Sequence, residues 1–152
     1  MGIKRFVADK DTTIVNSFKD DLSTRSVLSN TGMSDILEVY SIFSRVAAES
    51  LEKSRILISF DLDELPGMSL PANTKYYLKL FNAAHSESLP RSFKVSVRPI
   101  ASDWEEGVGL DLIGYADEDQ ASWLAKQSMR ISQVVSIELA TENAAAYANQ
   151  SI

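Results

Sequence analysis

The sequence predicts an all-β protein built from antiparallel strands. Apolar side chains recur mainly with a period of two, which is typical of strands that have one buried face. The alternating segments are short and numerous, and residues that favour turns separate them. Patterns typical of helices are scarce. Together these observations favour an antiparallel sandwich or barrel over an α/β fold.

About seven short strands are expected along the chain. They cover residues 4–8, 12–16, 36–43, 55–62, 75–81, 93–99 and 131–139. The cleanest alternation is that of residues 93–99, where Phe93, Val95 and Val97 are expected to face inward and Lys94, Ser96 and Arg98 outward. In the third strand both faces carry apolar side chains, so we expect both faces to be at least half buried.

Turn residues mark the breaks between the strands. Gly32 ends a Ser-Asn-Thr-Gly sequence, and Pro66 with Gly67 gives a second turn signal. Glycine tolerates positive φ and proline presets the preceding corner. Residues 82–87 are expected to form a long hairpin loop.

Helices are expected only near the C-terminus, and they number one or two. Residues 118–129 could form one, with Asp117 or Asp119 as its N-cap. Residues 141–147 could form a second, because alanine has the highest intrinsic helix propensity.

Length and composition predict a single domain over residues 1–152. Of the 152 residues, 45% are hydrophobic and 24% are charged, which are ordinary values for a globular protein. A chain of this size buries about 68–70% of its unfolded surface, so it can form a core without covalent staples. The sequence contains no internal repeat or linker that would divide it. Residues 130–152 stand apart as a segment suited to an interaction tail.

Charge and residue usage exclude several classes of function. Fifteen basic and 21 acidic residues give a net charge of −6, which argues against nucleic-acid and anionic-membrane partners. The absence of cysteine excludes disulfides, thiolate zinc sites and cysteine nucleophiles. No apolar run reaches the length of a membrane span or of a signal peptide, so we expect a cytoplasmic-type compartment. The single histidine, His85, lies in a polar loop, where we expect a surface residue without a catalytic role.

An acidic run resembles part of a calcium loop. Asp61, Asp63 and Glu64 cluster the oxygen ligands that hard cations prefer. The glycine and glutamate that an EF-hand needs at its sixth and twelfth positions do not follow. We therefore expect a solvated acidic turn, and no metal site or cofactor.

Trp104 with Glu105 and Glu106 pairs an aromatic ring with two carboxylates, as sugar-binding or glycosidase sites do. Glycosidases hold two carboxyl groups about 5–9 Å apart across a cleft, whereas neighbouring residues on a strand point to opposite faces. We therefore expect Trp104 to cover one end of the core and both glutamates to face water. The sequence also lacks a serine-nucleophile motif and a glycine-rich phosphate loop, so no enzymatic activity is expected. Glu106 and His85 are the residues to mutate if an activity is ever found.

Five segments, in chain order, share one further pattern. They are a Lys-Asp-Thr-Thr-Ile strand at 10–14, an Asn-x-Gly loop and strand at 30–37, an arginine leading into Ile-Leu-Ile-Ser-Phe-Asp-Leu at 54–62, a strand at 76–80, and a segment at 93–107 that ends in Trp-x-Glu-Gly. In this order they resemble the DNRLRE domain family over roughly residues 10–123.

The resemblance implies a jelly-roll-type β-sandwich. Such domains occur in secreted polysaccharide-binding modules and in structural proteins of tailed-phage virions. This chain looks more like the phage version in residues 1–6, 34–42 and 104–111. The resemblance therefore implies a non-enzymatic virion protein, such as a decoration, neck or tail-attachment component. It would assemble in the host cytoplasm as an oligomer with other virion proteins.

The sequence departs from the family after Trp123, where a further pair of strands usually closes the sandwich. Here only residues 131–139 and an alanine-rich tail follow. The expected result is an unpaired sheet edge, which a lone protein would have to cover. A neighbouring chain or copy could cover it by strand addition. The chain could equally be a fragment of a longer protein.

Binding surfaces are expected to be anchored by aromatic side chains. The interface candidates are Phe6, Phe18, Tyr40, Phe43 and Trp123, although most aromatics at strand spacing pack in a core. The rival interpretation is a carbohydrate-binding module. It predicts two or three aromatic side chains exposed in a row on one face, with polar groups beside them.

Overall fold

A computed structural model confirms an all-β, antiparallel fold with almost no helix among the residues it describes. It describes residues 2–44, 50–83, 94–110, 116–117, 121–124 and 129–139. The strands are β1 (Ala8–Asn16), β2 (Ser29–Asn30), β3 (Ser41–Ser44), β4 (Ser50–Phe60), β5 (Val95–Ser102), β6 (Ala116–Asp117) and β7 (Met129–Leu139). A short 3-10 turn, η1 (Leu65–Gly67), follows β4 at the expected Pro-Gly signal.

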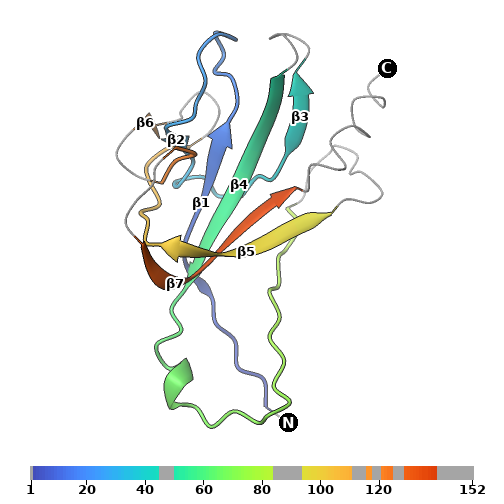
Figure 1. Cartoon of the computed structure of the whole chain (residues 1–152), viewed down its shortest axis with the longest axis vertical. Helices are drawn as coiled ribbons and strands as arrows, with labels where there is room; N and C mark the ends of the chain where they lie inside the picture. Colours follow the sequence, from blue (N-terminus) through green and yellow to red (C-terminus); the bar gives the residue numbers. More distant parts are fainter. Residues whose placement is uncertain are drawn as a thin grey trace.

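These strands form one seven-stranded sheet in which β4 is the spine. The order is β5-β7-β4-β1-β2-β6, with β3 also beside β4, and every pairing is antiparallel. One edge of β4 pairs with β1 along most of its length. The other edge is shared, because β3 pairs with the first residues of β4 and β7 pairs with Ile56–Ile58. In Figure 1, β5 and β7 run obliquely across β1 and β4.

The centre of β4 is buried on both faces, which explains its dense run of apolar residues. Ile56 and Ile58 lie on one face, and Leu57 lies on the other. Leu57 packs with Ile14 of β1, in line with the side-chain alternation of a strand. The expected alternation of residues 55–62 is therefore present, but neither of its faces is left to solvent at the centre.

In the described part of the chain, irregular segments and Ile100 of β5 pack on the buried centre of β4 and on Ile14. Trp104 and Ala121 pack on the Leu57 face. Leu37 and Val39, which precede β3, pack on the Ile56 face. The packing of the core therefore comes partly from loops that lie over the sheet and partly from β5.

β5 has the opposite orientation to the one expected. Val95 and Val97 are exposed, whereas Ile100 packs against the core cluster around Leu57 and Trp104. A period-two pattern defines two faces but does not say which is buried, and a one-residue offset exchanges them. Phe93 lies outside the described residues.

Other expected strands are shorter than predicted or are not formed. Residues 36–40 are irregular: the side chain of Ser54 accepts a hydrogen bond from Tyr40 N and donates one to Glu38 O, and Ser54 N donates the one backbone bond to Tyr40 O that joins these described segments. Residues 75–81 and most of residues 4–8 are also irregular. The two-residue strands β2 and β6 were not predicted.

The helix expected over residues 118–129 is not observed in its described part. Ala121 N donates to Glu105 O, and Leu124 N donates to Val27 O, so the backbone there is bonded to distant loops. Met129 already opens β7. The helix expected at 141–147 lies outside the described residues. Across the described ranges, no helix is both long and apolar enough to cross a membrane.

Candidate functional site

The Trp104 loop, residues 103–110, follows β5 and carries the most distinctive motif of the sequence. Trp104 is 7% exposed and packs against Ile14 and Leu57. This confirms the expectation that the indole covers part of the core. A tryptophan in this position stabilises the sheet and is withdrawn from contact with a ligand.

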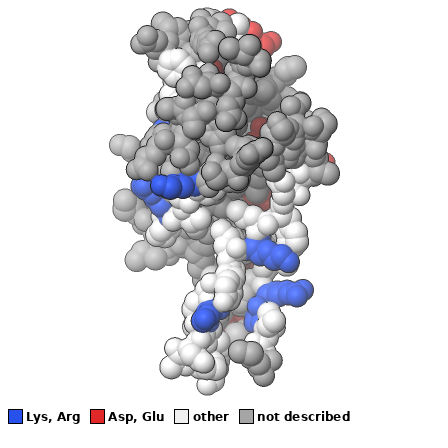
Figure 2. Space-filling model, turned by 90° about the vertical axis from the view of Figure 1, so that its right-hand side faces the viewer, with Lys and Arg blue, Asp and Glu red and all other residues white. Residues whose placement is uncertain are grey.

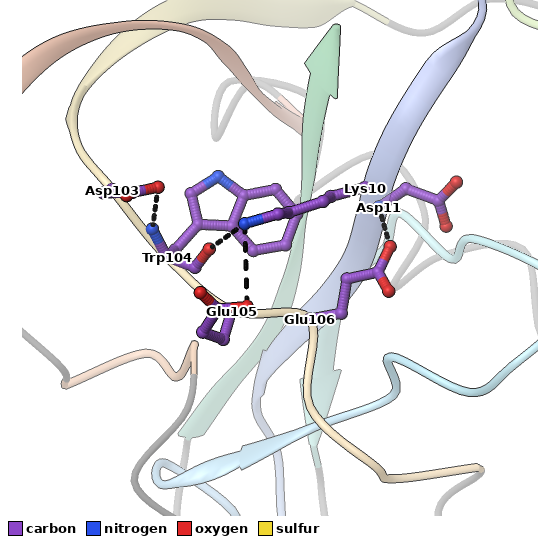
Figure 3. A network of polar contacts seen from close by, with 6 residues as sticks. All are labelled: Lys10, Asp11, Asp103, Trp104, Glu105 and Glu106. Carbon is purple, nitrogen blue, oxygen red and sulfur yellow. Dashed lines mark hydrogen bonds and ion pairs between the residues drawn. The ribbon is translucent and has the colours of Figure 1, made fainter. Parts of the chain in front are cut away.

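Polar contacts hold the Trp104 loop on β1 (Figure 3). The ammonium of Lys10 donates a hydrogen bond to Trp104 O at 3.3 Å and lies 3.6 Å from a carboxylate oxygen of Glu105. Trp104 N in turn donates to the Asp103 carboxylate at 2.9 Å. Glu105 is largely exposed, as expected, so its ion pair with Lys10 is worth at most about 1 kcal/mol.

Glu106 does not simply face water, contrary to the expectation. Its Oε1 accepts a hydrogen bond from the backbone N–H of Asp11 at 2.6 Å, and its side chain is half-buried. Burial raises the pKa of the Asp11 carboxyl above its ordinary value of 3.8, and the negative charge of Glu106 raises that pKa further. The two carboxylates therefore repel each other at neutral pH while a backbone bond keeps their residues together.

A second set of contacts joins the Trp104 loop to β2. The side-chain oxygen of buried Asn30 accepts hydrogen bonds from Gly32 N at 3.3 Å and Gly109 N at 3.2 Å. Gly107 has φ +91°, and a Cβ there would overlap the Asn30 side chain. A Cβ on Gly32 would overlap the backbone carbonyl of Glu106. Both glycines are required by close approach of the two loops.

The polar contacts of this region join the Trp104 loop to β1 and β2 and do not bring reactive groups together. One Glu106 oxygen is bonded to a backbone amide, and Glu105 is paired with Lys10. Four of the five motif segments of the sequence contribute strands or loops that pack or bond here or on the adjoining strands. The motif residues therefore have identifiable structural roles.

The acidic run after β4 is a turn. Asp63 N donates to the carboxylate of Asp61 at 3.0 Å, and Glu64 is paired with Lys4. Among the residues that the structure describes, no three His, Cys, Asp or Glu side chains are grouped to hold a metal ion. His85 lies outside the described residues.

Four of the five aromatic interface candidates are partly covered by neighbouring side chains. Phe6, Phe18 and Trp123 are half-buried, each with a cation over its ring: Lys4, Arg25 and Arg55, respectively. Tyr40 is half-buried and its hydroxyl is hydrogen-bonded to Ser17. Phe43, on β3, is the most exposed of the five, at 44%.

Among the described residues, the most exposed aromatic side chains instead lie on residues 75–81, which we call the open segment. Tyr77 and Phe81 are 83% and 82% exposed, and Tyr76 is 70% exposed. Lys79 stacks over the Phe81 ring, with its Nζ 4.6 Å from the ring centre. The alternation of lysine and aromatic residues without any acid was the sequence signal that could have identified this surface.

The open segment extends from the end of the molecule that also holds the N-terminal residues (Figure 1). Figure 2 shows lysine and arginine side chains there among mostly uncharged ones. Acidic side chains lie at this end too, because Glu64 is paired with Lys4, so the uncompensated basic residues of the open segment, within the described chain, are Lys75 and Lys79. Comparison of the chain with family models, with curated proteins and with solved structures finds no match.

Proposed function

We propose that this chain is a non-enzymatic structural or assembly protein of a tailed-phage virion, with a jelly-roll-type sandwich as its complete fold. The proposal starts from the resemblance of five ordered segments to the DNRLRE family. Its support in the fold is the exposure of Tyr76, Tyr77 and Phe81 on one segment. Large exposed apolar patches are typical of surfaces that bind other proteins.

The packing of the motif residues fits this role. Trp104, Asn30 and Gly107 hold loops on the sheet, so the motif provides a rigid body and leaves recognition to other residues. A pre-formed β surface can then bury area against neighbouring subunits, with aromatic anchors supplying most of the binding energy. Partners in this proposal are other virion proteins, and the place of action is the virion assembled in the host cytoplasm.

Native mass spectrometry tests the proposal. The purified chain is measured alone and mixed with the virion proteins encoded by the same genome. A stable complex with one of them, weakened by Tyr77→Ala and unchanged by Leu28→Ala, is the expected result. Leu28 is an exposed control far along the sequence from the open segment. A chain that binds none of these proteins would rule out the assembly role.

The carbohydrate-binding alternative is favoured by the same exposed rings. Tyr76, Tyr77 and Phe81 occur within six residues, beside Lys75 and Lys79, and this combination suits an anionic polysaccharide. Burial of Trp104 argues against a version in which this tryptophan stacks on a sugar. Titration with alginate, with neutral dextran as control, separates the two functions, because only the module predicts saturable binding to the anionic polymer.

A further inference from the structure

The open segment has the sequence of a strand but no strand partner among the residues that the structure describes. Tyr76, Leu78 and Leu80 lie on one side of the alternation, with lysines and aromatics on the other. No hydrogen bond joins the backbone of residues 75–81 to another part of the described chain. Unpaired backbone groups beside apolar side chains are a template for pairing with another strand.

The outer strand β5 is a weaker template. Within the described residues its neighbour is β7, so its other edge is open, but Pro99 lies within it and removes a backbone donor. Arg98 adds charge beside this position. The open segment contains no proline that would block a ladder, and its residues are exposed throughout.

The sequence of the open segment complements itself. In a two-fold antiparallel pair, residues of one face oppose residues of the same face, so the pair must be centred on a residue. Centred on Leu78, it places Lys79 opposite the second copy's Tyr77 and Lys75 opposite its Phe81. The other face then joins Tyr76 with Leu80, and Leu78 with itself. Each lysine meets an aromatic ring, a favourable cation–π contact.

The neighbouring registers do not have this property. A pair centred on Tyr77 sets Lys75 against Lys79, and a pair centred on Lys79 sets that lysine against itself. Like charges directly opposite each other destabilise a strand pair. The stacking of Lys79 on Phe81 within one chain shows that this lysine already lies along an aromatic face.

We propose that residues 75–81 form an antiparallel strand pair, centred on Leu78, with the same segment of a second copy of this chain. The inference rests on the proposed function in that it assigns a partner to the surface from which that function was argued. The pair would be small, so the dimer would be weak and concentration-dependent. Strand addition supplies its backbone hydrogen bonds, and the alternating side chains set its register.

The oligomeric state of the full chain tests this pairing. Sedimentation equilibrium across micromolar to millimolar concentrations should show a monomer–dimer equilibrium. Leu78→Lys sets two lysines against each other at the centre and should weaken the dimer about tenfold or more. Leu70→Lys is the matched control, because Leu70 is 41% exposed and Leu78 is 38% exposed. Circular dichroism checks that both variants retain the fold.

Cross-linking tests the register directly, since the chain has no cysteine of its own. Opposed Cβ atoms in a strand pair lie about 4.5–5.5 Å apart, near the range that a disulfide spans. Leu78→Cys should therefore form a disulfide-linked dimer on mild oxidation, and Leu70→Cys should not. Equal cross-linking at both positions, or a dimer that survives Leu78→Lys, would overturn the proposed interface.

The outcomes separate this inference from the proposed function. A chain that stays monomeric at every concentration but binds virion proteins refutes self-pairing and leaves the assembly role standing. A chain that dimerises through Leu78 but binds no virion protein supports self-pairing and refutes that role.

Discussion

Gly107→Ala should destabilise the protein by at least about 3 kcal/mol. Gly107 has φ +91°, a conformation that costs an alanine about 1–2 kcal/mol. The new Cβ would also overlap the Asn30 side chain, whose oxygen accepts hydrogen bonds from Gly32 N and Gly109 N. If Asn30 moves away, the buried N–H of Gly109 and the partly buried N–H of Gly32 lose their acceptor, at a cost of about 1–3 kcal/mol each. The lower ends of these ranges, about 1 kcal/mol for the backbone and about 1 kcal/mol for each of the two N–H groups, add to the expected loss of at least about 3 kcal/mol.

Urea denaturation followed by tryptophan fluorescence measures this loss. With an m value of about 2 kcal/mol/M, the midpoint should fall by about 1.5 M. Gly67→Ala is the control, because a Cβ at Gly67 meets open space, and its effect should be small.

A double-mutant cycle separates the clash from the backbone cost. In an Asn30→Ala background the overlap with Gly107→Ala is gone, so the substitution should cost only the backbone term of about 1–2 kcal/mol. An equal cost in both backgrounds, or a loss at Gly107 no greater than at Gly67, would refute the packing of these two loops.

Three further outcomes follow from individual residues. Because the pKa of Asp11 is raised in the folded protein, the contribution of this carboxyl to stability is most favourable below pH 3.8 and is lost as the pH rises through the folded-state pKa. Asp11→Asn should therefore raise the free energy of unfolding at neutral pH by less than about 1 kcal/mol, and should not raise it at low pH. Urea titrations at several pH values check this, and a gain that grows at low pH would contradict it. Leu22 has φ +53°, a conformation that glycine adopts without strain, so Leu22→Gly should raise the melting temperature. Leu28→Gly, at a similarly exposed residue with ordinary φ, is the control and should not raise it. Calorimetry that ranks the two variants the other way would exclude strain at Leu22. Hydrogen bonds from the side chain and backbone of Thr24 and from Ser23 N lower the pKa of Asp21. The stabilising contribution of the Asp21 carboxylate is therefore present above pH 3.8 and is lost only in strongly acidic solution. Asp21→Ala should reduce the free energy of unfolding at neutral pH, and urea titrations should show that the difference from the original protein shrinks in acid.

The part of the fold that sequence predicts best is the centre of the sheet. The period-two pattern of residues 55–62 predicts a strand there, and β4 spans Ser50–Phe60. Burial of Trp104 was also predicted, because a large apolar ring is stabilised by packing on a core while charged neighbours favour water. Both features depend on neighbours in sequence.

Features that depend on distant partners were not predictable in the same way. The orientation of β5 is set by where Ile100 meets the core, and a period-two pattern fits either orientation. Glu106 was expected to face water, and that expectation was wrong because the backbone N–H of Asp11, from which Glu106 accepts a hydrogen bond, lies 95 residues away in the sequence. The contact of Asn30 with Gly107 likewise joins two loops that no local pattern connects.

The candidate surfaces show the same division. Aromatic residues were identifiable, but their exposure depends on which cation or hydroxyl lies beside each ring. Phe18 and Trp123 are partly covered by arginines, whereas Tyr77 is 83% exposed and Phe81 stays 82% exposed although Lys79 lies over its ring.

The position of β4 as spine of the sheet has a consequence for folding kinetics. Its partners β1 and β7 come from opposite ends of the described chain, and its pairing with β3 alone is local. Loops must close over long stretches before most of the ladder forms, so the protein should fold slowly, in milliseconds to seconds, rather than in microseconds. The hairpin of β3 and β4 is the natural nucleus, and until β7 arrives half of one edge of β4 is exposed to aggregation.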